Sequence, residues 1–440
     1  MRFASIFPRL IKPWRNLSPT HNKTVQPNPL VSYQLSQQDL IQIKENLERI
    51  LTKNIIPFWY PQVVDLDFGG YLLNHDLEGN LKCRADKCIV TQARTVWFFS
   101  RLARTEYGTT EHLKAAAHGY KFLREQMWDK QFGGFYWEVD SSGEIATKPD
   151  KHLYGQAFGL YALSEYAMVT GESSAKGLAQ ELFNLLEYNA HDSRYGGYLE
   201  SFRRDWNLVP ADKTSYMNTT SVIKLMNTHI HLMEAIMMYY LIIKDQIAME
   251  RLIELIFVLS NTVVRKTVGA CTDKYQHNWI PLFKPGYDRV SYGHDLENIW
   301  MLIEACNTAG IPNSLLLDLY RTLFNYALQY GFDRKEGGFF ESGPLNAPAN
   351  KKDKIWWVQA ECLVSALQMY SLTRDEVYFN CFYQTLGWIV KHQADWEHGD
   401  WYAQVAENGK PSGDKAGAWK SPFHNGRAMI KCLELLTPLT

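Results

Sequence analysis

A short phrase built on paired glycines and aromatic residues recurs along the chain and constrains its fold more than any other feature. Four copies are clear and two are weaker: Asp67-Phe-Gly-Gly-Tyr71, Gln131-Phe-Gly-Gly-Phe-Tyr-Trp137, Arg194-Tyr-Gly-Gly-Tyr198, Glu336-Gly-Gly-Phe-Phe340, Gly269-Ala-Cys-Thr-Asp-Lys-Tyr275 and His398-Gly-Asp-Trp-Tyr402. The copies lie roughly 60 to 75 residues apart, and such a period indicates a repeat architecture. Each copy is typical of a glycine turn followed by a short strand.

The segments between these phrases carry helical patterns that are apolar on most sides. They include residues 91–107, 155–170 and 226–243. A helix that is apolar on most sides is buried on most sides. About six helix pairs, with hairpins at one end, predict an all-α (α/α)6 barrel. We expect its inner helices to be buried and its short β-hairpins to lie at the active-site end.

The length of 440 residues allows one large domain or two ordinary ones. No linker interrupts the repeat, so we expect residues 34–440 to form a single catalytic domain. Residues 1–33 carry several arginines, lysines and prolines and no acidic residue. They lack the long apolar stretch of a secretory signal. We interpret them as a disordered basic extension or the product of an upstream start codon, with a transit peptide as a weaker alternative.

Composition narrows the class of partner. Lysine plus arginine number 46 against 47 for aspartate plus glutamate, which gives no electrostatic reason to expect nucleic acid or an anionic membrane. The 14 tryptophans are suited to stacking on sugar rings, although a large helical protein also uses aromatic residues in its core. Seven scattered cysteines without a CxxC favour reduced thiols in a cytoplasmic protein. No apolar run approaches the roughly 20 residues of a membrane span.

Two histidine motifs suggest an acid/base pair. In Gly293-His294-Asp-Leu-Glu297, one helical turn separates the histidine from the glutamate, so the two share a face. A neighbouring carboxylate favours imidazolium and orients the ring, which suits proton transfer near neutral pH. The glycine-led, apolar flanks favour burial over a surface pair. The second histidine stands in Trp419-Lys-Ser-Pro-Phe-His424-Asn-Gly-Arg427.

Asn227, His231 and Glu234 form a polar stripe on an otherwise apolar helix. Buried polar groups need partners, and sugar hydroxyls could supply them. His229 points elsewhere and is interpreted as a core histidine. An HxH pair on a helix is poor geometry for one zinc ion, and neither HExxH nor CxxC is present. We therefore expect no metal.

Further polar groups stand at the starts of other apolar helices. Arg94 must be paired or must face a polar ligand. Tyr154 offers a hydroxyl, and the run Trp356-Trp357-Val-Gln359-Ala-Glu361 offers indoles beside a carboxylate. Together they occupy corresponding points of successive repeats, as a central pocket would require.

The motifs together resemble the N-acylglucosamine 2-epimerase superfamily, and their phrasing most resembles its cellobiose 2-epimerase branch. The likeness spans about residues 40–436 and rests on five motifs: Gln92-Ala-Arg94, Asn227-Thr-His229-Ile-His231, Gly293-His294-Asp-Leu-Glu297, Trp356-Trp357-Val-Gln359-Ala-Glu361 and Trp419-Lys-Ser-Pro-Phe-His424-Asn-Gly-Arg427. The (α/α)6 barrel of that family agrees with the repeat.

The resemblance implies a role for each residue. His294 and His424 would exchange protons with opposite faces of C2 of an opened aldose, through a cis-enediolate. Glu297 would orient His294, and Arg94 would stabilise the enediolate oxygen. The implied substrate-binding residues are Tyr154, Asn227, His231, Trp356, Trp419 and Glu361. Neither a cofactor nor a metal is implied. We expect a small carbohydrate substrate and a monomer or homodimer.

Two positions depart from the cellobiose 2-epimerase pattern. Thr219 stands where an acidic residue is usual, and Phe423 replaces a tyrosine. Both bear on sugar preference, and a mannose 2-epimerase or aldose–ketose isomerase remains the main alternative, with an N-acylglucosamine 2-epimerase behind it. An inverting glycoside hydrolase would need two carboxylates about 6.5–9.5 Å apart, with Glu234, Asp295 and Glu361 as candidates. A non-catalytic sugar-binding protein would need neither histidine.

Overall fold

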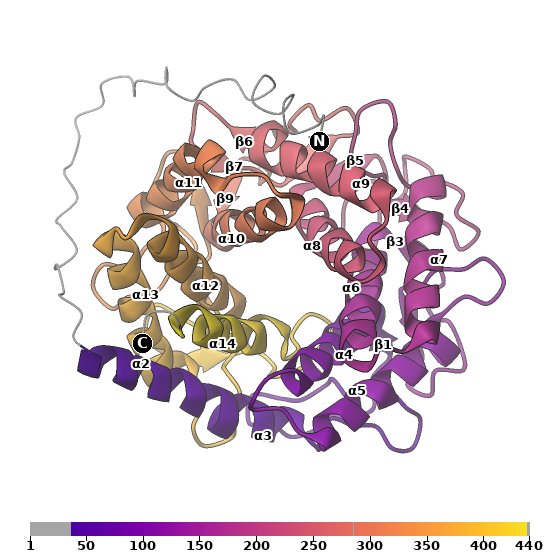
Figure 1. The fold of residues 1–440 in the computed structure, drawn as a ribbon, viewed down its shortest axis with the longest axis horizontal. Helices are drawn as coiled ribbons and strands as arrows, with labels where there is room; N and C mark the ends of the chain where they lie inside the picture. The colour runs from indigo at the N-terminus through magenta and orange to yellow at the C-terminus, as the bar shows by residue number, and fades with distance from the viewer. Residues whose placement is uncertain (1–36, 285, 438–440) are drawn as a thin grey trace.

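The computed structural model describes residues 37–284 and 286–437, in which helices form two concentric rings (Figure 1). The inner ring consists of α4 (Ile89–Ala103), α6 (Leu153–Thr170), α8 (Met226–Ile243), α10 (Tyr292–Ala309), α12 (Trp356–Thr373) and α14 (Phe423–Leu436). The outer ring consists of α2 (Gln37–Arg49), α5 (Thr110–Phe122), α7 (Ser173–Asn189), α9 (Gln246–Phe257), α11 (Leu317–Tyr330) and α13 (Glu376–Trp388). The predicted (α/α)6 barrel is confirmed. The predicted extension at residues 1–33 lies outside the described residues.

Each inner helix packs against the next along the chain, and the last packs against the first. Contacts run from α4 through α6, α8, α10 and α12 to α14, and α14 then touches α4. The first outer helix, α2, also packs on α14 (Figure 1). The ring is therefore closed by contact between segments from opposite ends of the described chain.

The inner helices are buried because both of their faces meet other helices. In α6, every residue from Leu153 to Ala167 is buried. Small residues allow this close packing: a Cβ on Gly159 would lie 2.4 Å from the ring of Phe135. Gly171, with φ +69°, then ends α6 in a left-handed conformation that glycine adopts without strain.

Short segments complete the outer layer. The helix α3 (Ile56–Trp59) and the 3-10 turn η6 (Asn313–Leu315) lie in connections. Four outer helices end in a π-helical turn: η3 (Ile50–Ile55), η4 (Leu123–Met127), η5 (Val258–Thr262) and η7 (Ile389–Gln393). No helix in residues 37–284 and 286–437 is both long enough and apolar enough to cross a membrane. All seven cysteines are free thiols.

Antiparallel strand pairs link neighbouring repeats at one end of the barrel. They are β1 (Lys87–Cys88) with β2 (Glu138–Val139), β3 (Lys151–His152) with β4 (Ser201–Phe202), β5 (Ile223–Leu225) with β8 (Lys274–Gln276), β6 (Val264–Arg265) with β7 (Ala270–Cys271), β9 (Arg289–Ser291) with β10 (Ser342–Pro344), and β11 (Lys354–Ile355) with β12 (Gln404–Val405), which also pairs with β13 (Pro411–Ser412). Most of these pairs join the strand that enters an inner helix to a strand of the following repeat.

The recurring glycine turns are held by buried ion pairs. In the first turn, Lys87 Nζ donates to Asp65 Oδ2 at 2.8 Å and to the Gly69 carbonyl at 2.6 Å. Equivalent pairs follow at 3.0, 2.7, 2.8 and 2.5 Å: Lys151–Asp129, Lys224–Asp192, Lys354–Asp333 and Lys415–Asp395. Gly69 and Gly70 have positive φ values of +83° and +66°, which explains the paired glycines.

A second contact ties four of these turns to an inner helix, and we call it the hairpin clamp. Gln92 Oε1 accepts from the Tyr71 backbone nitrogen, and its Nε2 donates to the Tyr71 carbonyl. Gln156 and Gln359 repeat the clamp on Phe135 and Phe339. His229 accepts from the backbone nitrogen of Tyr198, which agrees with its interpretation as a core histidine. The clamps fix the hairpins over the starts of the inner helices, where the site lies.

Candidate functional site

The first turns of the inner helices surround a cavity of about 270 Å³. It is lined by Arg94, Tyr154, Met217, Asn227, His231, His294, Glu297, Trp356, Trp357, Trp419 and His424. Every inner helix contributes at least one of these residues. Nine of the ten site residues predicted from the sequence line the cavity, and Glu361 does not.

His294 and His424 reach this cavity from helices that are not neighbours, because α12 lies between α10 and α14. The Trp357 ring is close to both histidines, with centroid distances of 4.7 Å to His294 and 5.9 Å to His424. Trp357 was not among the predicted site residues. The sequence motif offered both indoles of the Trp356-Trp357 pair, and the family resemblance implied a role for Trp356 alone.

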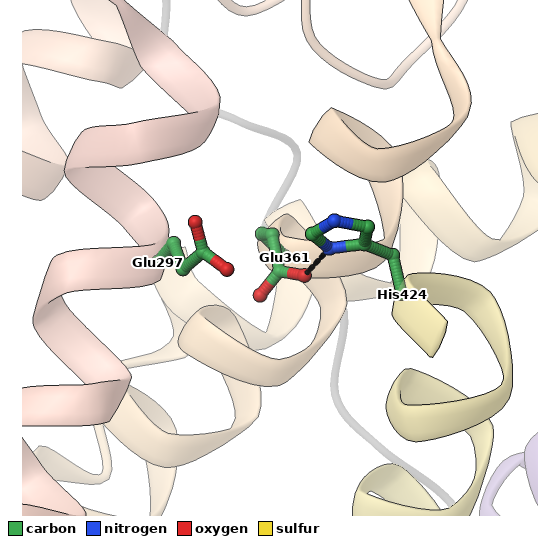
Figure 2. A group of neighbouring side chains, drawn as sticks. All are labelled: Glu297, Glu361 and His424. Carbon is green, nitrogen blue, oxygen red and sulfur yellow. Dashed lines mark hydrogen bonds and ion pairs between the residues drawn. The ribbon is translucent and has the colours of Figure 1, made fainter. Parts of the chain in front are cut away.

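His424 is held by a carboxylate on the neighbouring helix. Its Nδ1 lies 2.6 Å from Glu361 Oε1, and the other ring nitrogen points away from Glu361 (Figure 2). Glu361 Oε1 also accepts from Arg427 Nη2 at 2.8 Å, and Oε2 accepts from Trp300 Nε1 at 2.8 Å. Both oxygens are therefore occupied by protein donors. Glu361 thus contacts His424 and is not among the residues that line the cavity, whereas the sequence predicted that it binds substrate.

Glu297 was expected to orient His294, and its position differs from that expectation. Its Oε1 accepts from Arg427 Nη2 at 3.0 Å, and within residues 37–284 and 286–437 no hydrogen bond joins it to His294. A spacing of three residues places both side chains on one face, but the guanidinium from α14 takes the carboxylate. Burial, together with the charge of Glu361, raises the pKa of Glu297 well above its ordinary value. Glu297 thus presents a protonation-prone carboxyl to the cavity.

Arg427 donates hydrogen bonds to three buried carboxyl groups at once. It donates to Glu234 at 2.8 Å, to Glu297 at 3.0 Å and to Glu361 at 2.8 Å. Atoms of Glu297, Glu361 and His424 lie within 4.8 Å of one another, a spacing that could hold a metal ion (Figure 2). The buried guanidinium already supplies a cation to both carboxylates, so we assign no metal to this group.

Arg94 is a cation that faces the cavity without a carboxylate partner among the described residues. Its Nη2 donates to Tyr154 Oη at 2.9 Å, and Nη1 donates to the Trp419 carbonyl at 3.2 Å. The guanidinium also lies 4.1 Å from the centroid of the Phe158 ring. Such a charge, held in place by neutral groups, is available to an anion in the cavity.

Burial of the histidines favours neutral rings. Burial, followed by the charges of Arg94 and Arg427, lowers the pKa of His424 well below its ordinary value. Burial lowers the pKa of His231 to about 4, although its Nδ1 lies 3.5 Å from Glu234 Oε2. Burial also lowers the pKa of His294, against the opposing charges of Asp273 and Glu361. Neutral imidazoles can accept protons at neutral pH.

Several polar atoms of the cavity residues have no hydrogen-bond partner among the residues that the structure describes. They are Arg94 Nε, Asn227 Oδ1, His231 Nδ1 and Trp356 Nε1, all of which are buried. Buried polar atoms in proteins are almost always hydrogen-bonded, so their gathering at one cavity points to a polar ligand. Trp419, 45 % exposed at the rim, offers an aromatic face.

A second cavity, of about 440 Å³, adjoins the first and shares His294 and Trp357 with it. Its charged lining residues are Asp273, Lys274, Arg289, Asp295 and Glu341. Sequence reasoning did not predict this cavity. Most of these residues come from strands and loops at the hairpin end, where helical periodicity gives no signal.

The two positions that depart from the cellobiose 2-epimerase pattern line neither cavity. Thr219 is buried, and its hydroxyl lies 2.9 Å from that of Ser215. The Phe423 ring packs edge-on against Trp97 and Phe158. Met217, from the same loop as Thr219, is the residue of that loop that lines the smaller cavity. Any effect of Thr219 or Phe423 on sugar preference is therefore indirect.

Comparison with known proteins gives a consistent picture. Residues 70–427 match the family model described as N-acylglucosamine 2-epimerase. The chain is 31 % identical over 398 residues to a cellobiose 2-epimerase of Bacteroides fragilis, covering 90 % of this chain and 98 % of the relative. It is 33 % identical over 396 residues to that of Ruminococcus albus, covering 88 % and 96 %. A D-mannose isomerase of Marinomonas mediterranea is 26 % identical over 401 residues, covering 87 % and 94 %.

Solved structures agree with these relatives. The cellobiose 2-epimerase of Bacillus thermoamylovorans superimposes with a TM-score of 0.82 at 28 % identity, covering 91 % of this chain and 100 % of that one. A GH76 α-mannanase of Bacteroides thetaiotaomicron reaches a TM-score of 0.58 at 10 % identity, covering 90 % and 96 %. At that identity the likeness concerns the barrel alone.

Proposed function

Because the chain belongs to the N-acylglucosamine 2-epimerase family and is a sugar 2-epimerase, we propose that it inverts C2 of the reducing-end aldose of a β-1,4-linked disaccharide such as cellobiose. The observation that carries the proposal is the placement of His294 and His424 in one cavity, on helices separated by α12. Two bases on different sides of one carbon are what inversion by proton transfer requires.

In the proposed reaction the opened aldose lies between the two histidines. One imidazole takes the proton from C2, and the electron pair of the C–H bond forms a C1–C2 double bond as the carbonyl oxygen becomes an enediolate oxygen. The other histidine, protonated, returns a proton to the opposite face of C2. The carbonyl re-forms and the epimer results, with no net gain or loss of electrons.

Arg94 would stabilise the enediolate. Its charge has no carboxylate partner in the described part of the chain, and Tyr154 and the Trp419 carbonyl hold the guanidinium at the cavity wall. Fixed donors that face a developing charge account for a large part of many enzymatic rate enhancements. The hydroxyl of Tyr154 would share this task.

The remaining residues would bind and orient the sugar. Asn227 and His231 offer polar atoms to hydroxyl groups, and Trp356 and Trp419 offer aromatic faces to the sugar rings. Glu297, with its raised pKa, would donate a hydrogen bond to a sugar oxygen rather than orient His294.

The adjoining cavity supports a disaccharide substrate. It is larger than the first and is reached past His294 and Trp357, so a second glycosyl unit would have a polar chamber beside the reacting aldose. Ligand cavities of a few hundred Å³ are typical of small-molecule sites. A monosaccharide would use the smaller cavity alone.

The second candidate function is a mannose 2-epimerase or aldose–ketose isomerase, favoured by the likeness to a D-mannose isomerase. Return of the proton to C1 instead of C2 would give a ketose from the same enediolate. A glycoside hydrolase has less support, because Glu234 and Glu361 are both bound to Arg427 and do not line the cavity.

The test is NMR of the purified protein in D2O with cellobiose and, separately, with mannose. We expect deuterium at C2 and a growing mannose-type anomeric signal from cellobiose. Exchange with mannose alone would assign the protein to the monosaccharide branch, and ketose signals would indicate isomerisation. Released glucose would indicate hydrolysis. The absence of exchange with either sugar would contradict the proposal for these substrates.

A further inference from the structure

The two histidines of the site have different surroundings, and this difference carries an inference that rests on the proposed function. His424 bonds a buried carboxylate through Nδ1, whereas the described contact of His294 is with the Trp357 ring. We propose that Glu361 is a positioning residue that fixes His424 with its proton on Nδ1, so that Nε2 is the atom that exchanges protons with the sugar.

The other hydrogen-bond partners of Glu361 are both donors, so Glu361 acts as an acceptor. Oε2 accepts from the Trp300 indole, and Oε1 accepts from Arg427. A guanidinium cannot accept a hydrogen bond, and an indole nitrogen only donates. Glu361 therefore meets donors on both oxygens and accepts from His424 as well. The proton in the bond of 2.6 Å belongs to Nδ1.

Fixing Nδ1 leaves Nε2 as the basic atom. A neutral imidazole has one protonated and one unprotonated nitrogen. The nitrogen that donates a hydrogen bond keeps the proton, and the other nitrogen is left basic. Figure 2 shows the second ring nitrogen on the side of His424 that faces away from Glu361. Because His424 lines the smaller cavity, this nitrogen is the one available to a ligand there.

Glu361 also bears on the charge of the reacting ring. When Nε2 takes the C2 proton, its electron pair forms the N–H bond and the ring becomes an imidazolium with protons on both nitrogens. The adjacent carboxylate stabilises that cation, as in other His–carboxylate pairs. His294 lacks such a hydrogen-bonded carboxylate in the described residues, so the two histidines are not interchangeable.

Charged groups from every packed helix act on His424 and enter the test. Arg94 on α4 and Arg427 on α14 disfavour its protonation, as does a protonated His231 on α8. Glu234 on α8 and Glu361 on α12 favour it, and Glu297 on α10 belongs to the same Arg427 group. Only Glu361 among them hydrogen-bonds the ring.

The kinetic test is Glu361→Gln in the full-length protein, assayed with whichever sugar shows C2 exchange. An amide can accept from Nδ1 but carries no charge, so we expect kcat to fall by about 10²- to 10⁴-fold while KM changes little. The imidazolium loses its stabilising charge, so the acid limb of the kcat/KM profile moves to lower pH. A fall in kcat with an unshifted acid limb would reduce Glu361 to a structural residue.

Two matched variants separate the effect of the charge from damage to the network. Trp300→Phe removes the donor on Oε2 but keeps the carboxylate on His424, so the acid limb should not move to lower pH. Glu234→Gln removes a different carboxylate from Arg427, one that makes no hydrogen bond to the His424 ring but whose charge also favours its protonation, so we expect a smaller shift of the acid limb. A shift to lower pH of equal size in Glu234→Gln would assign the effect to Arg427 and overturn the proposal.

A sugar-free measurement distinguishes this inference from the choice of substrate. Long-range ¹H–¹⁵N NMR of protein labelled with ¹⁵N-histidine, with His424→Ala for assignment, reports which nitrogen holds the proton. We expect the Nδ1-protonated ring at neutral pH. An Nε2-protonated ring would overturn the proposal whatever sugar the enzyme uses, and an Nδ1-protonated ring would uphold the tautomer even if cellobiose fails as a substrate.

Discussion

Asp295 Oδ1 accepts a hydrogen bond at 3.1 Å from the backbone nitrogen of Cys271. This is the hairpin clamp of α10, and at the same position α4, α6 and α12 carry a glutamine. The amide of glutamine is neutral and can both accept and donate hydrogen bonds. The carboxyl group of aspartate is neutral, and able to donate, only when it is protonated. Burial raises the pKa of Asp295 to about 8. One residue beside the proposed catalytic His294 is thus sensitive to alkaline pH.

Asp295→Asn should flatten the pH dependence of stability. The folded protein binds one more proton than the unfolded chain between about pH 4 and pH 8, so wild-type stability falls as pH rises through that window. The amide cannot titrate. Thermal unfolding between pH 5 and 9 would show a smaller loss of Tm in the variant. Gln359→Glu, which places a carboxyl in the α12 clamp, should add such a loss, and identical slopes in all three proteins would refute this account.

His294→Ala and His424→Ala should each abolish turnover while sugar binding persists. General acid–base groups contribute about 10²- to 10⁴-fold each, and inversion needs both. Deuterium exchange at C2 measures turnover, and calorimetric titration with the sugar measures binding. Normal turnover in both variants would defeat the two-histidine mechanism.

Arg94→Met should lower kcat by about 10²- to 10³-fold, the size found when one donor to a developing oxyanion is removed. KM should change less, because the charge acts mainly on the enediolate. Arg101→Met is the matched control, since Arg101 lies on the same helix but pairs with Glu434 at the surface. Equal losses in the two variants would point to damage to α4 rather than to loss of the oxyanion contact.

Lys354→Met should destabilise the fold by about 3–5 kcal/mol, the cost of leaving one member of a buried ion pair without its partner. Asp333 would keep a buried charge whose pKa is lowered chiefly by Lys354, despite burial. Lys335→Met removes an exposed pair with Glu336 and should leave the urea midpoint nearly unchanged. Urea unfolding compares the two, and similar midpoints would contradict the importance of the turn.

Removal of metal by EDTA should leave activity unchanged. Arg427 already provides a cation to Glu297 and Glu361, the carboxylates closest to a metal-like arrangement with His424. The assay is epimerisation before and after dialysis against the chelator. A complete loss that zinc restores would require a metal at this group or elsewhere.

Helical periodicity predicted the inner ring well because burial on most sides leaves a clear apolar pattern. The predicted helix over residues 226–243 coincides with α8, and those over 91–107 and 155–170 differ from α4 and α6 by a few residues at their ends. The apolar flanks of His294 predicted its place at an inner-helix start, whereas His424, which starts α14, was expected in a turn. Helical periodicity predicts the face of the helix on which a residue lies, but not which residue of another helix contacts that face.

The errors at the site follow from that limit. Glu361 and Glu297 were assigned to the sugar and to His294, but Arg427 from the last inner helix reaches both. Trp357 lines the cavity together with Trp356, although only Trp356 was predicted to bind the sugar. The larger cavity is lined by hairpins from different repeats, and a local sequence pattern does not predict how those hairpins pack against one another.

Closure of the barrel by α14 has a consequence for synthesis. Domains tend to begin folding from their N-terminal end while translation continues. A nascent chain that has emerged only through α12 possesses Arg94, Tyr154, His231 and His294, but neither His424 nor the guanidinium that donates to Glu234, Glu297 and Glu361. These buried carboxyl groups would lack their cationic partner until the final helix docks. We therefore expect catalytic competence to arrive in a single late step, when α14 brings both His424 and that cation to the core.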